Sequence, residues 1–251
     1  MPNELFIHHI FKFFSPEELC LASSVCRKWR VCASDESLWK AFDLTKLFPS
    51  LKIIDGRMWN AHFDLNVFGL SLRNEPILDK RKEIPFIKKL FATLKIEGDA
   101  GITRLTLPQG LTFNKLVNLA DSPKQGDPAS FKDVWSYITK VLGEISVDKT
   151  QVIYISNSIL EGSRNLDDEE LPQFARGTGC EMPEVLPAAT LAILTYVCFQ
   201  KRLYGADPWT YTLCSGDIVV GGFGRSGLVA SSLYLIHWGE GYGVGAMKAL
   251  N

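Results

Sequence analysis

The residues whose types and spacing could do chemistry lie in the second half of the chain. The segment from Gly222 to Gly227 follows the apolar run Ile218–Val220 and satisfies G-x-G-x-x-G. This is the local signature of a loop that binds a dinucleotide pyrophosphate. The full fingerprint also requires a helix, a second strand and an acidic residue about twenty positions further on. Because the sequence from Leu228 to Ile236 is strand-like and followed by glycine-rich turns, we predict a hairpin turn and no cofactor.

Two other constellations could support catalysis. Ser163 or Cys180 could act as a nucleophile with one of four histidines, but no histidine lies near either residue in sequence and neither sits in a nucleophile-elbow motif. The acidic run Asp167–Glu170 could supply paired carboxylates or metal ligands. A short acidic run beside Pro172 is more typical of a solvated loop. Neither constellation therefore predicts a catalytic site.

The cysteines and histidines do not indicate a metal site. The adjacent His8 and His9 would point to different faces of a helix, and the cysteines include no C-x-x-C pair. Cysteines in such apolar or helical contexts are typical of buried thiols in a reducing compartment. The six cysteines are Cys20, Cys26, Cys32, Cys180, Cys198 and Cys214.

Composition excludes several functional classes. The net charge is -1 and no stretch concentrates Lys and Arg, so the chain has no electrostatic basis for binding nucleic acid or an anionic membrane. The N-terminus has no basic segment followed by an apolar one, so we predict no cleaved signal peptide and a cytoplasmic location. The longest apolar run, Leu186 to Phe199, is shorter than the roughly 18 residues that span a bilayer and predicts a buried helix.

The N-terminal sequence predicts three helices. Apolar residues in Met1–Phe14 recur at the spacing of one helical face. Ser15, Pro16 and Glu18 form the pattern of an N-cap, a first-turn proline and a capping box, so a second helix must begin here. Its apolar stripe comprises Leu19, Ala22, Val25, Cys26 and Trp29, and a short third helix follows over residues 35–39.

The remaining sequence predicts an α+β domain. Pro85 is placed to open an amphipathic helix, and a polar, glycine-containing stretch over residues 160–181 predicts an exposed loop. We expect strands at 102–107 and 151–156 and helices at 114–120, 130–142 and 186–199. Spacing of about ten residues then predicts a C-terminal antiparallel meander with strands at 209–213, 218–223, 228–235 and 244–247.

The N-terminal motifs resemble the F-box family over residues 1 to about 42. The matching segments are Pro2–Leu5, Leu19, Val25–Arg30 and Asp35–Trp39, and Met1 stands where the family usually has leucine. F-box proteins dock on the Skp-type adaptor of the SCF ubiquitin ligase. The resemblance implies adaptor contacts at Pro2, Leu5, Ile10, Leu19, Val25, Cys26, Leu38 and Trp39.

This resemblance implies a non-catalytic substrate adaptor that recruits a target protein for ubiquitination. A helical unit of some forty residues buries too little surface to be stable alone, so a partner should complete its apolar face. A few of these contact residues should supply most of the affinity for the Skp-type adaptor. A substrate adaptor of this kind would act by tethering its target to the ligase. Tethering raises the local concentration of a target lysine near the ubiquitin-charged enzyme.

The rest of the chain is similar to the non-repeat region of F-box proteins from amoeba-associated, chlamydia-like bacteria. This resemblance implies a secreted effector that uses the ligase of its host in the host cytosol. The segments that carry it are 96–103, 122–126, 208–212 and 219–223.

We accordingly expect an F-box helical module at 1–48, a linker with short helices at 49–80 and an α+β target-recognition domain at 81–251. Exposed loop aromatics are the best candidates for target contacts, because they combine apolar area with a polar tip. They are Trp209, Tyr211, Phe223, Trp238 and Tyr242.

Two alternatives remain open. The chain could bind the ligase adaptor as a scaffold or competitor without promoting ubiquitination, and reconstituted ubiquitin transfer would separate these cases. It could also be an enzyme fused to an F-box and acting on a nucleotide or peptide. A deep polar pocket around Gly222–Gly227 would favour that second alternative.

Overall fold

The computed structural model describes residues 3–164, 166–205, 208–235 and 241–250. The chain folds into two compact units. The first contains residues 1–49 and 77–90, and the second contains residues 50–76 and 91–251. The segment 50–76, expected as part of a linker, therefore belongs to the second unit.

Helices are the only regular secondary structure in the described residues of the first unit. Its elements are α1 (Asn3–His9), the 3-10 turn η1 (Phe11–Phe13), α2 (Pro16–Val25), α3 (Arg27–Ala33), α4 (Glu36–Lys40), α5 (Leu44–Leu47) and α7 (Lys80–Thr93), of which residues up to Leu90 belong to this unit. Its core combines Phe11, Leu19, Ala22, Cys32, Leu38, Trp39 and Leu44, all buried. On α7, Ile84, Ile87 and Leu90 are buried at helical spacing, as the amphipathic pattern predicts. Pro85 lies inside this helix and does not open it.

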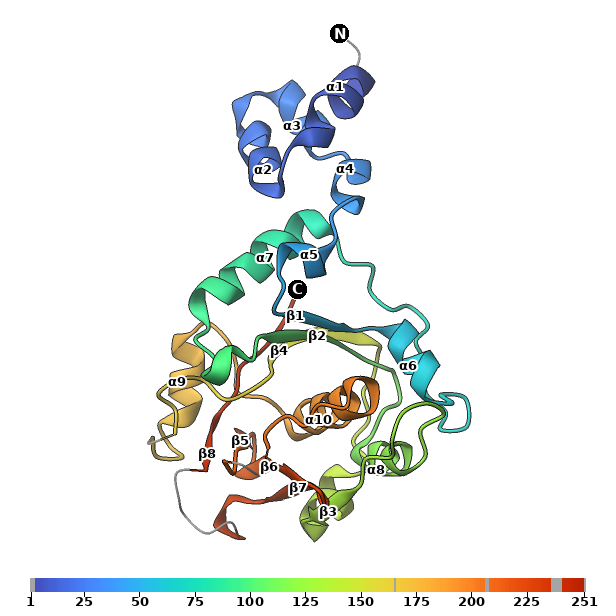
Figure 1. Ribbon diagram of the computed structural model, residues 1–251, viewed down its shortest axis with the longest axis vertical. Helices are drawn as coiled ribbons and strands as arrows, with labels where there is room; N and C mark the ends of the chain where they lie inside the picture. The colour runs from blue at the N-terminus through green and yellow to red at the C-terminus, as the bar shows by residue number, and fades with distance from the viewer. Residues whose placement is uncertain (1–2, 165, 206–207, 236–240, 251) are drawn as a thin grey trace. The chain divides into compact units, whose positions relative to one another are not determined.

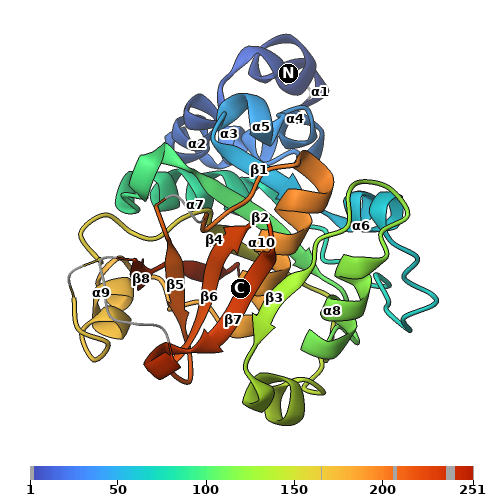
Figure 2. The same ribbon diagram turned by 60° about the horizontal axis from the view of Figure 1, so that its bottom comes forward.

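The second unit contains two sheets. The first has strand order β1-β2-β4-β9, built from Leu51–Ile54, Ile102–Leu107, Gln151–Ser156 and Met247–Ala249. The second has order β3-β7-β6-β5-β8, built from Phe131–Val134, Gly227–Ser232, Ile218–Gly224, Tyr211–Cys214 and Tyr242–Val244. Its five strands lie side by side in Figure 2. The chain is thus of the expected α+β class, with antiparallel β5, β6 and β7 at the centre of the second sheet.

Helix α10 (Val185–Phe199) organises this unit because it packs against strands of both sheets (Figure 1). It contacts β6 and β7 of one sheet and β2 of the other. A helix enclosed in this way must be apolar on all sides. This explains why the run beginning at Leu186 shows no polar face. Among the described residues, no helix combines the length and apolarity required to cross a membrane.

The other helices of the second unit are α6 (Gly56–His62), α8 (Phe113–Asp121) and α9 (Leu171–Gly177). The short turns are η2 (Glu97–Asp99), the π-helical η3 (Ile138–Leu142) and η4 (Leu233–Leu235). Trp59 of α6 is fully buried, and its indole N–H donates to the Thr106 carbonyl at 2.7 Å. This contact binds the expected linker segment into the core.

The single strand expected at 244–247 is instead the end of β8 and the start of β9, which lie in different sheets. Two longer segments also differ from the sequence expectation. Residues 130–142, expected as a helix, form β3 and η3 because the segment pairs in parallel with β7. Residues 160–181, expected as an exposed loop, include α9, whose Leu171 and Ala175 are buried. In both cases tertiary contacts outweigh the local composition.

Candidate functional site

Two of the N-terminal helices, α2 and α4, begin at side-chain caps, and the sequence predicts the cap of α2. The Glu18 N–H donates to Ser15 Oγ at 3.3 Å, and the Ser15 N–H donates to Glu18 Oε2 at 2.6 Å, which completes a capping box at the start of α2. Asp35 caps α4 by accepting from the Ser37 N–H at 2.9 Å. These caps hold both helices at fixed starting points.

Replacing the cap should measurably weaken the first unit. We expect Ser15→Ala to lower the free energy of unfolding by about 1 kcal/mol, because the Glu18 amide loses its acceptor. Thermal unfolding of the variant and of Ser23→Ala tests this. The Ser23 hydroxyl donates within its own helix to the Cys20 carbonyl and is not a cap. Equal stability of Ser15→Ala and the unmodified chain would contradict the role of the cap.

The predicted stripe from Leu19 to Trp29 does not lie on a single helix. Cys26 has an extended backbone (φ -160°, ψ 168°), so α2 ends at Val25 and α3 starts at Arg27. The break turns Val25 and Cys26 away from the core, whereas Leu19 stays fully buried. Trp29 faces inward and packs edge-to-face on Phe11, with ring centroids 5.4 Å apart.

The structure separates the predicted adaptor contacts into exposed and buried groups. Ile10, Val25 and Cys26 are exposed, whereas Leu19, Leu38 and Trp39 are buried. Pro2 and the side chain of Leu5 lie outside what the structure describes. The buried residues belong to the unit's own core, and the exposed ones are available to a partner.

Sequence reasoning missed Leu21, which forms an exposed apolar pair on α2 with the predicted contact Val25. Leu21 and Val25 are one helical turn apart and are 69% and 63% exposed. Leu21 lies off the buried stripe of Leu19 and Ala22, and this departure from the stripe is the signal that could have identified it. Phe13 and Val31 are also exposed and were missed. Leu21 and Val25 thus present adjacent apolar side chains to solvent on α2.

Cys20 and Cys26 are exposed, contrary to the expectation of buried thiols. Partial burial, and then the charge of Glu17, raise the pKa of the Cys20 thiol. The thiol is therefore neutral at physiological pH and adds to the uncharged surface of α2. The pKa of Glu17 itself is lowered, chiefly by its hydrogen bond from Lys88 of α7 at 2.9 Å.

Trp39 anchors the C-terminal part of the module. Its indole N–H donates to the Ala33 carbonyl at 2.7 Å, which joins α4 to the end of α3. A cavity of about 420 Å³ in this unit is bordered by both α1–η1 and α4. The residues that line it are Ile7, Phe11, Lys12, Phe14, Ser37, Leu38, Ala41 and Phe42. Leu38 is thus reached from this cavity, while Trp39 is enclosed.

Helix α7 is attached to the module by cationic side chains. Arg81 donates to the Ser34 carbonyl at 2.9 Å, and Lys80 donates to the carbonyls of Lys40 and Phe42. The expected start of the second domain at residue 81 therefore needs correction, because these contacts place most of α7 with the first unit. The sequence did not reveal that α7 belongs to the first unit, because a long stretch of chain separates this helix from α4.

The predicted target contacts in the second unit are not all exposed. Phe223 is buried in β6 and packs on Tyr196 with centroids 5.3 Å apart, and Tyr242 is buried in β8. Trp238 lies outside the described residues. Trp209, 48% exposed, stacks parallel on Tyr211 at 6.2 Å. Only these two of the five form an accessible aromatic surface among the residues that the structure describes.

The catalytic candidates have structural roles. Ser163 Oγ donates to the Leu160 carbonyl at 2.7 Å and accepts from the Val244 N–H at 3.1 Å. Burial raises the pKa of the Cys180 thiol, which disfavours the thiolate that nucleophilic attack requires. Within the described ranges no group of His, Cys, Asp and Glu is arranged to hold a metal ion.

The glycine-rich segment forms the predicted hairpin. Gly224 pairs with Gly227 between antiparallel β6 and β7. Gly227 has φ +119°, and a Cβ there would lie 2.5 Å from the Ser130 carbonyl oxygen. The close approach of the Ser130 backbone therefore explains why position 227 is glycine, and no bound nucleotide is needed for that explanation.

Comparison with known proteins bears on the first unit. No solved structure matches the chain. Residues 1–45 match a family described as F-box-like, and this range covers α1 to the start of α5 and ends before β1. F-box domains are non-catalytic modules that bind Skp-type adaptors within cullin SCF complexes. The chain therefore carries an F-box-like domain at residues 1–45.

Proposed function

We propose that this protein is a substrate adaptor that docks on the Skp-type subunit of a cullin ubiquitin ligase and recruits a target through its second unit. The observation that carries the proposal is the exposed apolar surface of α2 within the F-box-like domain, at Leu21 and Val25. A partner that covers these side chains would remove apolar area from water, which is the main favourable term in association.

In this proposal, some of the predicted contact residues touch the partner and others support the surface from inside. Ile10, Val25 and Cys26 meet the partner directly, as does Leu38 through the cavity that it lines. Leu19 and Trp39 support this surface from inside. Pro2 and Leu5 remain proposed contacts on the strength of the sequence resemblance alone.

Recruitment falls to the second unit because it contains most of the chain and its own core. The stacked pair of Trp209 and Tyr211 is a candidate target contact, with Lys132 Nζ 5.7 Å from the Trp209 ring centroid. The positive charge of Lys132 beside these rings favours a partner that brings an anionic group. Action as a bacterial effector in a host cytosol remains part of this proposal and rests on the sequence resemblance.

The adaptor-docking proposal is tested by charging the exposed pair on α2. We expect Leu21→Glu/Val25→Glu to weaken binding of a purified Skp-type adaptor by about 100-fold or more, because two carboxylates would be buried at the interface. Titration by calorimetry measures this. Ile77→Glu is the control, since Ile77 is 95% exposed in the same unit and lies outside the F-box-like match.

Unchanged affinity of a folded Leu21→Glu/Val25→Glu chain would refute this docking surface. Failure of the unmodified chain to bind any Skp-type adaptor would refute the proposed function itself. Ubiquitin transfer to a bound partner, reconstituted with a complete ligase, separates a recruiting adaptor from a scaffold or competitor.

A further inference from the structure

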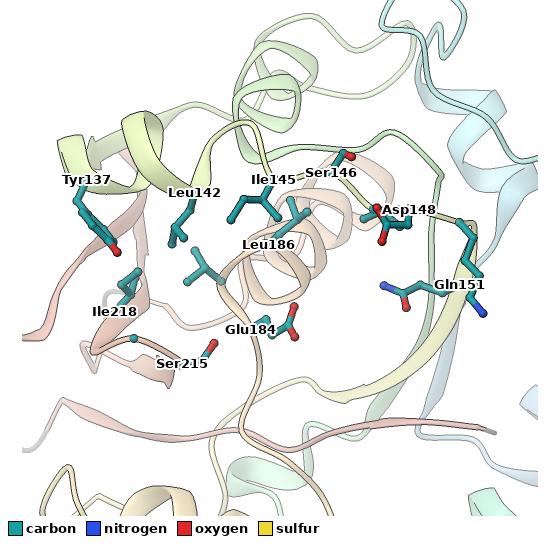
Figure 3. A pocket seen from close by; sticks show the side chains of 14 residues that line it. Tyr137, Leu142, Ile145, Ser146, Asp148, Gln151, Glu184, Leu186, Ser215 and Ile218 are labelled. Atoms are coloured by element: carbon teal, nitrogen blue, oxygen red, sulfur yellow. The ribbon is translucent and has the colours of Figure 1, made fainter.

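A pocket of about 520 Å³ opens in the second unit, where four segments meet (Figure 3). They are η3, the loop that leads into β4, the first turn of α10 and the turn between β5 and β6. Its volume lies within the roughly 300 to 1,000 Å³ typical of ligand sites. Gly216 lines it and the Gly222–Gly227 hairpin does not, so it is distinct from the dinucleotide motif.

One side of the pocket is apolar. Leu142, Ile145 and Leu186 converge there, and Tyr137 and Ile218 extend the same wall (Figure 3). Ile218 is fully buried at the start of β6, which fixes the position of this wall. An apolar side chain placed against it would be removed from water on several sides, a gain that grows with the area buried.

The other side of the pocket carries charge. Asp148 and Glu184 both line it, and Gln151 directs its amide toward them (Figure 3). In the described part of the chain, neither carboxylate has a hydrogen-bond or ion-pair partner. Lys149 is the one basic residue of the lining, so the lining has more negative than positive charge. This balance favours a cationic group and disfavours an anionic ligand.

The surface beside the pocket indicates a chain and not an enclosed small molecule. Tyr137, Val141 and Ile145 recur every four residues, and all three are exposed. Exposed apolar side chains that continue from a pocket are typical of a protein interaction surface. The middle of this row belongs to a π-helical turn, a rare geometry found frequently at functional sites.

We propose that this pocket binds a short segment of a recruited protein in which an apolar side chain stands close in sequence to a Lys or Arg. The apolar side chain packs on Leu142, Leu186 and Ile218, and the cation lies between Asp148 and Glu184. The Gln151 amide can donate to and accept from the bound backbone. Recruitment of that protein to a ligase rests on the proposed function, whereas binding of the segment does not.

The proposal is tested with the full chain and labelled, end-blocked peptides of identical Gly-Ser flanks. Each peptide carries one central pair of residues, which is Leu and Arg, Leu and Glu, or Ser and Arg. Each pair is tested with no glycine, one glycine or two glycines between its two residues. Fluorescence polarisation should show that a Leu/Arg peptide binds about 10-fold or more tightly than the Leu/Glu and Ser/Arg peptides of the same spacing. The absence of any such preference at every spacing would overturn the proposal.

Charge reversal provides the second arm. Asp148→Lys/Glu184→Lys should lose the preference for Leu/Arg and gain one for Leu/Glu, whereas Asp121→Lys/Glu161→Lys, exposed and outside the pocket, should keep the original order. The near-isosteric Asp148→Asn/Glu184→Gln variant should weaken Leu/Arg binding by about 10-fold without reversal. A preference for Leu/Arg that persists in both pocket variants would refute the assignment.

These outcomes are independent of the docking proposal. Adaptor affinity should be the same in the pocket variants and in the unmodified chain. If the unmodified chain does not bind the adaptor but still selects between the peptides, the proposed role in a ligase is refuted and the peptide site stands.

Discussion

Trp39→Ala is expected to unfold the first unit and thereby abolish adaptor binding without touching the docking surface. The side chain is buried, and its removal leaves a large cavity and deprives the Ala33 carbonyl of its donor. Removal of a buried Trp costs about 3–5 kcal/mol. A helical unit of this size has little stability in reserve. The destabilisation should therefore exceed the free energy of unfolding of the first unit.

Hydrogen exchange followed by mass spectrometry measures this effect separately in each unit. Peptides from residues 3–49 should lose protection in Trp39→Ala, while peptides from α10 keep theirs because they belong to the other unit. Phe13→Ala is the matched aromatic control, since Phe13 is exposed. Native-like protection of residues 3–49 in Trp39→Ala would show that Trp39 does not hold the module together.

This result determines how binding experiments on the module are designed. Loss of adaptor binding in a Leu38→Ala/Trp39→Ala chain would follow from unfolding alone, because both residues are buried. Variants at Leu21 and Val25 change the surface and leave the core intact. They are therefore the informative test of docking.

Gly101→Ala is expected to destabilise the second unit far more than Gly98→Ala, although both glycines have positive φ in the same short segment. A left-handed alanine costs about 1–2 kcal/mol at either position. At Gly98 a Cβ would meet no atom within 4 Å, but at Gly101 it would lie 2.1 Å from the Ser50 carbonyl oxygen. Relief of that overlap should cost about 1–3 kcal/mol more.

The overlap matters because it lies where β1 begins to pair with β2. Leu51 is opposite Ile102 in this parallel register, and the Ile102 N–H donates to the Ser50 carbonyl at 3.3 Å. Urea unfolding of the two variants gives the difference in stability directly. Equal destabilisation by the two substitutions would show that β1 can move aside without loss of the sheet.

Local sequence signals predicted the elements whose geometry depends on their own residues. Ser15 and Glu18 predicted the start of α2, and short strand-like runs, with clustered apolar residues at 152–155, predicted β2 and β4. The strand-like sequence after Gly227 predicted a hairpin and not a nucleotide loop. The α2 cap and the hairpin form between residues close together in sequence, whereas β2 and β4 pair across a long stretch of chain and only the strand character of each was predicted.

The predictions that failed concern segments with distant partners. The segment Phe131–Val134 forms a strand because β7, nearly a hundred positions later in the chain, supplies its hydrogen bonds. The stripe of α2 predicted one long helix, but the extended backbone of Cys26 divides it. The exposure of Phe223 was also mispredicted, because Tyr196 of α10 covers its ring.

By itself, the sequence determined that the chain begins with a capped helical module, that its remainder is of the α+β class, and that the module resembles an F-box. These conclusions depend on residue order, caps and short-range periodicity, which are present in any conformation of the chain. Only the tertiary structure decided which apolar side chains face water and which segments complete each unit. Burial of Leu38 and Trp39, exposure of Leu21 and Val25, and the lining of one pocket by both Asp148 and Glu184 depend on how segments distant in sequence pack together.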